Sequence, residues 1–195
     1  EKYLKKVVPL VEDRNVVKAG VGLAIFVACE EAKKDNCKVI LSGLGAEQLF
    51  GGYNRYYNYQ EINSEGFNMN LEGMYGLLQI YERDSYREDV IAMYHGLELR
   101  VPYLDRDLID YCLKLPTSFK IDGDQDKIIL RDVAKLYLGE YSERKKKATQ
   151  YGSGFDQALT KLSKKDKAGF LKKYYGSSLK LGALLSGGKD SVYAL

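Results

Sequence analysis

Long hydrophobic runs are absent from this 195-residue chain. The longest apolar segment, VVKAGVGLAIFVACEEA at 16–32, contains a lysine and two glycines and is too short for a membrane span. We predict a buried core helix there, and no membrane contact. No signal-peptide pattern precedes this segment, so we expect a cytoplasmic protein.

Cysteine and histidine are scarce. The three cysteines, Cys29, Cys37 and Cys112, lack CxxC spacing, and we interpret them as buried free thiols in a reducing compartment. His95 is the only histidine and ends a predicted apolar helix, where a structural hydrogen bond is commoner than a role as a base. Low-complexity tracts are absent as well, and 45% hydrophobic residues suffice for one soluble domain with a core, or one and a part.

The net charge of +3 conceals a basic C-terminal part. Residues 143–180 hold eleven Lys or Arg and three acidic residues. RKKK at 144–147 forms one cluster, and the lysines between 161 and 173 form a second, which we interpret as a solvated face. No base-stacking or groove-reading motif accompanies them, so nucleic acid is not expected as a partner.

The apolar spacing predicts mainly helices around a buried strand. Asn15 is the expected N-cap of the second helix, and Pro102 interrupts the helical region at RVPYLD. The expected elements are helices at 3–10 and 16–34, a parallel strand at 38–43, helices within 71–114, a helix at 125–138, a tail or linker over 150–180, and a strand, turn and helix start from 179.

Two glycine-rich turns are candidate ligand sites. SGLGAEQLFGGY at 42–53 follows the predicted strand, and ligands of α/β sheets bind beyond the carboxyl ends of strands. SGGKDS at 186–191 lies between a predicted strand and helix, so we expect its backbone N–H groups to form an anion nest for a phosphate or pyrophosphate. It does not match the GxxxxGK[ST] pattern of a Walker A loop.

Two pairs of charged residues are further candidates. Lys127 and Arg131 lie four apart, which places both on one flank of the predicted helix. Arg131 is equally compatible with a structural ion pair to Glu140 or Asp132. Arg100 and Asp105 flank the Val-Pro turn, where a salt bridge that supports the turn is at least as common as ligand contact.

These motifs together resemble the asparagine synthetases, which are N-type ATP pyrophosphatases of the PP-loop superfamily. The resemblance rests on LSGLGAEQLFGGY, YREDVIAMYHGLELRVPYLDRDLID, DKIILRDVAK and RKKKATQYGSG, in this order between residues 41 and 154. The terminal SGGKDS loop, with Lys189 inside it, resembles the diphthine–ammonia ligase branch instead. Four ordered segments are more specific than any single one.

The resemblance implies a fold and a reaction. The fold is an α/β, adenine nucleotide alpha-hydrolase-like (HUP-type) parallel sheet flanked by helices, with an incomplete sheet here and a mainly helical C-terminal half. The reaction is ATP-dependent amide formation: a small-molecule carboxylate is adenylated, pyrophosphate leaves, and ammonia then displaces AMP. ATP and Mg²⁺ are the implied cofactors.

The resemblance also implies roles for individual residues. Lys127 and Arg131 are the catalytic candidates, and Lys127 stabilises the charge on the leaving pyrophosphate. Asp190 is the candidate metal ligand. The remaining candidates are Ser186, Gly187, Gly188, Lys189, Asp190, Ser191 and Lys146 for ATP or pyrophosphate, Ser42, Gly43, Gly45 and Glu47 for the substrate-side loop, and Arg100 and Asp105 as supports of the turn.

The chain departs from the family pattern in three ways. Leu44 stands where asparagine synthetases have Asp or Glu, which puts aspartate in doubt as the substrate, although Glu47 keeps one carboxylate in the turn. No Cys-led glutaminase domain precedes the match, so ammonia is expected free or from a partner, either a glutaminase or a neighbouring PP-loop domain. The pyrophosphate loop follows the matched segments, whereas in the family it precedes them.

Two explanations of this order remain open. In the first, an asparagine-synthetase-like domain at 1–165 is followed by a basic Gly/Ser linker at 166–178 and the beginning of a second domain at 179–195. In the second, 179–195 is a circularly permuted first strand. The function is likewise open between an asparagine-synthetase-like ligase, a diphthine–ammonia-ligase-like amidation and a non-catalytic scaffold, which Leu44 favours.

Overall fold

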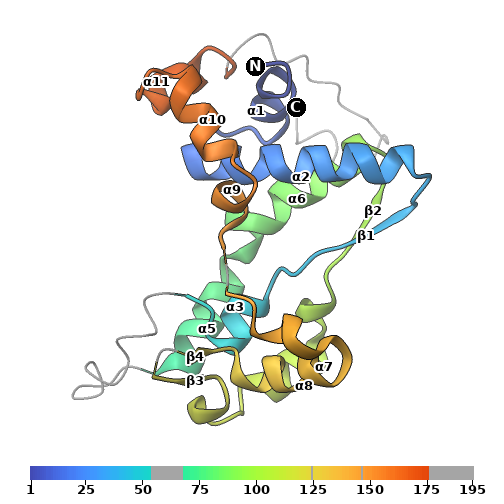
Figure 1. The fold of residues 1–195 in the computed structure, drawn as a ribbon, viewed down its shortest axis with the longest axis vertical. Coiled ribbons are helices and arrows are strands. Elements are labelled where there is room, and N and C mark those ends of the chain that lie inside the picture. The colour runs from blue at the N-terminus through green and yellow to red at the C-terminus, as the bar shows by residue number, and fades with distance from the viewer. Residues whose placement is uncertain (54–67, 124, 146, 176–195) are drawn as a thin grey trace, which may run out of the picture.

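A computed structural model describes residues 1–53, 68–123, 125–145 and 147–175. Within them the chain forms two groups of helices, one above the other in Figure 1, connected on one side by a pair of parallel strands. The expected α/β class, with mostly helices and a small parallel sheet, is confirmed. No helix of the described part is long and apolar enough to cross a bilayer.

The upper group is organised around one long helix, α2. Its members are α1 (Leu4–Leu10), α2 (Val16–Lys34), α6 (Tyr86–Tyr94), α9 (Thr149–Gly152), α10 (Phe155–Leu162) and α11 (Lys167–Lys172). Each of the other five helices contacts α2. The predicted core helix is therefore the centre of this group.

Asn15 begins α2, as the sequence predicted. Its side-chain oxygen accepts the backbone N–H groups of Val17 at 2.9 Å and Lys18 at 3.1 Å. Two N–H groups without a partner inside the helix are thereby satisfied, which fixes the first turn.

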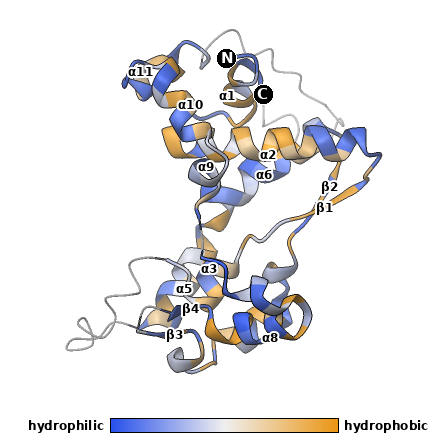
Figure 2. Ribbon diagram, viewed as in Figure 1, coloured by the Kyte–Doolittle hydropathy of each residue, from blue (hydrophilic) through white to orange (hydrophobic). Residues whose placement is uncertain are grey.

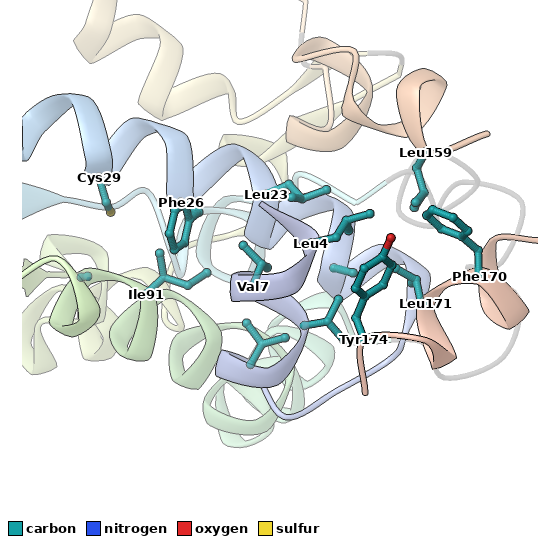
Figure 3. Close-up of a cluster of buried hydrophobic side chains, with 14 of the residues drawn as sticks. Leu4, Val7, Leu23, Phe26, Cys29, Ile91, Leu159, Phe170, Leu171 and Tyr174 are labelled. Carbon is teal, nitrogen blue, oxygen red and sulfur yellow. The ribbon is translucent and has the colours of Figure 1, made fainter. Parts of the chain in front are cut away.

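The upper core joins distant parts of the sequence. Phe26 and Cys29 of α2, Leu4 and Val7 of α1, and Ile91 of α6 are buried in one cluster (Figure 3). The cluster also contains Leu159, Phe170, Leu171 and Tyr174. Burial of such apolar side chains is the main source of stability for this group.

The sequence predicted a tail or linker over 150–180, including the linker at 166–178. The described residues of this segment instead form the helices α9, α10 and α11. Asp166 accepts the N–H of Gly169 at 2.9 Å and begins α11, whose Phe170 and Leu171 are buried. Gly154, at φ 76°, provides the left-handed residue before α10. The glycines therefore shape helix ends here, and the apolar residues between them pack on α2.

The strands β1 (Val39–Leu41) and β2 (Glu98–Arg100) pair in parallel, with Ile40 opposite Leu99. Both of these residues pack against the upper core, whereas Leu41 on the other face is 70% exposed. Figure 2 shows apolar residues along β1 and along α2. The strands thus place the turns that follow Leu41 and Arg100 at one edge of the pair.

The lower group has a smaller core. It contains α3 (Ala46–Phe50), α5 (Met69–Leu78), α7 (Arg106–Cys112), α8 (Ile128–Leu138) and the antiparallel pair β3 (Ile121–Asp122) and β4 (Gln125–Asp126). It also contains the 3₁₀ turns η3 (Pro102–Leu104), η4 (Thr117–Phe119) and η5 (Gly139–Glu143), and the π-helix η2 (Tyr81–Ser85) connects α5 to α6. Leu49, Phe50 and Cys112 form the centre of the core. The interruption predicted at RVPYLD is confirmed, because β2 and η3 occupy it.

The interpretation of the cysteines holds for two of the three. Cys29 and Cys112 are buried free thiols, whereas Cys37 is exposed. Cys37 lies between the end of α2 and the beginning of β1, within the exposed segment 33–38.

One lysine is buried beside the lower core. Lys120 is 1% exposed, and its Nζ donates to Asn70 Oδ1 at 2.6 Å. Asn70 in turn donates to the carbonyl of Leu115 at 3.0 Å, so α5 is tied to the segment before β3. Burial lowers the pKa of Lys120 from 10.5 to about 8.

We expect Lys120 to make stability depend on pH in the alkaline range. Between pH about 8 and 10.5 the unfolded state binds more protons at this amine, so the free energy of unfolding rises with pH. The rise is at most about 3 kcal/mol. Denaturant unfolding across this range should show it in the wild type and in Lys114→Met, an exposed control, but not in Lys120→Met. An equal rise in both variants would exclude Lys120 as its source.

Candidate functional site

The carboxyl ends of β1 and β2 lie side by side. The backbone N–H of Ser42 donates to the carbonyl of Arg100 at 2.9 Å and extends the strand ladder by one residue. The chain then turns through Gly43 and Gly45 into α3. The predicted substrate-side loop therefore lies at the edge of the sheet where α/β proteins bind ligands.

Gly45 makes this turn possible. Its φ is 95°, and a Cβ there would lie 2.6 Å from Leu104 Cδ2 and 3.2 Å from the carbonyl oxygen of Tyr103. Only glycine tolerates both the dihedral angle and the close approach. The turn is thereby held against η3.

Lys127 reaches this turn from the junction between β4 and α8. Its Nζ lies 2.9 Å from Glu47 Oε1 of α3, and the two side chains are 16% and 26% exposed. A Cβ at Gly52 would lie 2.4 Å from Lys127 Cε, so the absence of a side chain at Gly52 leaves the space that the Lys127 side chain occupies. The structure thus brings together Glu47 and Lys127, which are 80 residues apart.

Lys127 is not part of the helix predicted at 125–138. Residues 125 and 126 form β4, α8 begins at Ile128, and Lys127 has a left-handed backbone with φ 55° and ψ 36°. Such a conformation is costly for a residue with a side chain and is concentrated at functional sites. The prediction that Lys127 and Arg131 share one flank of a helix is therefore wrong.

Arg131 turns away from Lys127. Its guanidinium donates to the carboxylate of Asp126 at 2.7 Å and to the Asp126 carbonyl at 2.8 Å. It also donates to the carbonyls of Ser142 at 2.9 Å and Arg144 at 3.2 Å. The ion-pair partner is Asp126, not Glu140 or Asp132 as the sequence suggested. Arg131 joins β4, α8 and the beginning of the basic loop, which is a structural task.

The basic loop and α8 enclose a pocket with several cations. The pocket is lined by Tyr103, Lys127, Leu130, Arg131, Ala134, Leu138, Tyr141, Ser142, Arg144, Lys145, Lys147, Thr149, Gly152 and Ser153. Described acidic residues are absent from this lining. The electrostatics of the pocket suit an anion such as a phosphate group.

Sequence reasoning missed a buried polar network beside the turn. Glu88 of α6 accepts the hydroxyl of Ser42 at 2.5 Å, and the Ser42 oxygen accepts the N–H of Leu44 at 3.2 Å. Arg87 contacts Glu88 at 3.4 Å and Asp84 at 3.0 Å. Burial raises the pKa of Glu88, against the lowering effects of Ser42 and Arg87.

A signal for Glu88 was present in the helical spacing. Glu88 precedes the buried residues Ile91 and Ala92 by three and four positions, which places it on the same face of α6. A charged residue on a buried face requires polar partners.

The charged pair at the Val-Pro turn is not a salt bridge across it. Arg100 pairs with Glu98 at 2.8 Å, and both side chains are exposed. Asp105 accepts the N–H groups of Asp107 at 3.0 Å and Leu108 at 3.1 Å and so caps α7. Arg100 therefore pairs within β2 and Asp105 caps α7, with the η3 turn between them.

His95 packs between aromatic rings. Its ring centroid lies 4.5 Å from that of Phe26 and 5.1 Å from that of Tyr94. Burial lowers the pKa of His95. This packing supports its interpretation as a structural residue, but among the described residues its buried Nε2 has no hydrogen-bond partner, so the predicted hydrogen bond is not seen there.

Several predicted ligand residues lie outside the described residues. These are Lys146, Ser186, Gly187, Gly188, Lys189, Asp190 and Ser191. Within the described ranges, no group of three or more His, Cys, Asp or Glu could hold a metal ion. Mg²⁺ at nucleotide sites commonly takes one or two carboxylates together with phosphate oxygens, and Asp190, the predicted ligand, lies outside these ranges.

Comparisons with known proteins point to one family. The sequence model of the asparagine synthase family matches residues 1–71 and 69–167. The putative asparagine synthetase (glutamine-hydrolyzing) 1 of Methanocaldococcus jannaschii is 36% identical over 207 residues, covering 89% of this chain and 38% of that protein. The human asparagine synthetase domain-containing protein 1 is 34% identical over 164 residues, covering 78% and 25%. Asparagine synthetase B (glutamine-hydrolyzing) of Escherichia coli is 26% identical over 155 residues, covering 78% and 27%.

Proposed function

The chain belongs to the asparagine synthase family, and from this premise we propose that it catalyses ATP-dependent amide formation. The chain spans 38% or less of the length of each of the three relatives compared above. The activity of a whole relative is therefore only proposed for it. The observation that carries the proposal is the position of Lys127, which lies against Gly52 and Glu47 at the carboxyl end of β1.

The first step of the proposed reaction is adenylation. A carboxylate oxygen of the substrate attacks the α-phosphorus of ATP, a P–O bond breaks, and pyrophosphate leaves with the bonding electrons. Lys127 stabilises the negative charge that develops on the leaving group, because a fixed cation in a partly buried turn requires little reorganisation. The cations of the adjoining pocket, Arg144, Lys145 and Lys147, support binding of the phosphates.

The second step forms the amide. Ammonia attacks the acyl carbon of the adenylate, a C–N bond forms, the C–O bond to the phosphate breaks, and AMP leaves. Free ammonia or a glutaminase partner supplies the nitrogen in this proposal. Binding of pyrophosphate by residues 186–191 stays a prediction, as does a metal at Asp190.

A non-catalytic scaffold is the second candidate, and Leu44 favours it. The side chain of Leu44 cannot hold a water, a metal or the amino group of an amino-acid substrate, although its backbone N–H is fixed by Ser42. Diphthine–ammonia-ligase-like amidation rests on the terminal loop alone, outside the described residues.

Leu44→Asp distinguishes the enzyme from the scaffold. We expect the variant to increase aspartate-dependent ATP–pyrophosphate exchange about tenfold, which corresponds to one hydrogen bond to a charged group. Leu44→Asn, which lacks the charge, is the matched control and should gain less. A variant that neither exchanges pyrophosphate nor binds ATP would favour the scaffold.

A further inference from the structure

A second pocket lies behind the turn, on the side of the upper helices. Its lining is mostly apolar, from α2, β1 and β2, and its polar groups include Ser42, Glu88 and Thr149. Glu88 is the one carboxylate among the described lining residues. The pocket adjoins the turn in which the resemblance places the substrate.

Glu88 is held at the turn from two sides. Its Oε2 accepts the Ser42 hydroxyl at 2.5 Å, and the Ser42 hydroxyl oxygen in turn accepts the N–H of Leu44. Its Oε1 lies 3.4 Å from Arg87, which Asp84 and the carbonyl of Arg83 hold in turn. A π-helix, η2, directly precedes α6, and such π-turns are frequent at functional sites. A carboxylate therefore lies beside the turn position at which Leu44 provides none.

We propose that Glu88 accepts the proton that ammonium loses before it attacks the acyl adenylate, an inference that rests on the proposed function. The Glu88 carboxylate takes one proton from ammonium, and the resulting ammonia forms the C–N bond. The C–O bond to the phosphate breaks, AMP leaves with the electron pair, and the second proton leaves the nitrogen for solvent. Glu88 afterwards releases its own proton to solvent.

The surroundings of Glu88 suit proton uptake. A general base acts best when its pKa lies near the working pH, and burial raises the pKa of Glu88 from its ordinary acidic value. The charged or titratable groups near it are Arg87 and Asp84 on α6 and η2, and Cys29 on α2. Glu47, the other carboxylate of the turn, is engaged by Lys127 at 2.9 Å.

Glu88→Gln tests the proposal with two nucleophiles. Hydroxylamine is largely unprotonated at neutral pH and traps an acyl adenylate without a base, whereas ammonium needs one. Gln keeps an oxygen that accepts the Ser42 hydroxyl. We expect the ammonium-dependent rate to fall about 100-fold, with hydroxamate formation and ATP–pyrophosphate exchange nearly unchanged. Glu82→Gln, on an exposed position of η2, should change none of them.

Each other outcome overturns the proposal in a recognisable way. An equal loss with both nucleophiles would mean that Glu88 only shapes the turn. An unchanged ammonium rate would exclude it as the base, and absence of exchange in the wild type would overturn the proposed function together with this inference. Glu88→Asp, which keeps a carboxylate, should recover part of the ratio of the ammonium rate to the hydroxylamine rate. An equally low ratio in Glu88→Asp and Glu88→Gln would also contradict the proposal.

Discussion

Lys127→Met will lower carboxylate-dependent ATP–pyrophosphate exchange at least about 100-fold while the chain stays folded. The loss is expected because Lys127 is the cation that lies in the glycine-lined turn, and removal of one such charge-stabilising group typically costs this much. Glu47 is 26% exposed and can be solvated once Lys127 is removed, whereas Asp126, the partner of Arg131, is 4% exposed, so Lys127→Met should cost the fold less than Arg131→Met. Exchange kinetics and thermal unfolding on the same preparations would measure both effects.

Lys135→Met is the matched control for Lys127→Met. Lys135 is a lysine of α8 whose partner, Glu143, lies 3.5 Å away, and both side chains are exposed. This variant should exchange pyrophosphate at the wild-type rate. Equal rates in the wild type, Lys127→Met and Lys135→Met would exclude Lys127 from the chemistry.

Arg131→Met will lower the free energy of unfolding by about 3 kcal/mol, because it leaves the Asp126 carboxylate, whose side chain is 4% exposed, without the guanidinium. The carbonyls of Ser142 and Arg144 lose their donor as well. For a chain of this length the melting temperature should fall by about 6–12 °C. Denaturant unfolding at neutral pH measures the free energy directly.

Removal of Lys127 and removal of Arg131 are predicted to affect different properties of the protein. Lys127→Met should retain stability and lose exchange, whereas the effect of Arg131→Met on exchange should follow the fraction that remains folded. A stable Arg131→Met protein that has lost exchange would contradict the structural role and favour the catalytic one.

Local signals predicted α1 and α2 of the upper group well. The apolar spacing from Val16 and the cap at Asn15 both act within one turn of helix, so no distant contact was needed to place α2. The short strand before SGLG was predicted for a similar reason, as a run of apolar residues followed by a turn signal. The approach of Glu47 and Lys127 was not predictable from either local pattern.

Other features depend on contacts that no local pattern contains. Lys127 leaves the helix because β4 pairs with β3 immediately before it, and a two-residue antiparallel pair gives a weak sequence signal. The segment around Gly169 resembled a linker by composition, yet Phe170 and Leu171 find a core provided by α1 and α2. The helical spacing indicated the buried face on which Glu88 lies, but not its partner Ser42, which is 46 residues away.

The turn around Gly45, with Glu47 and Lys127, is in our proposal part of an adenylating site. ATP–pyrophosphate exchange by the whole chain with Mg²⁺, measured with aspartate, with other small carboxylates and without any carboxylate, tests it most directly. We expect exchange that requires one of the carboxylates. Absence of exchange with every carboxylate, together with absence of ATP binding, would contradict it.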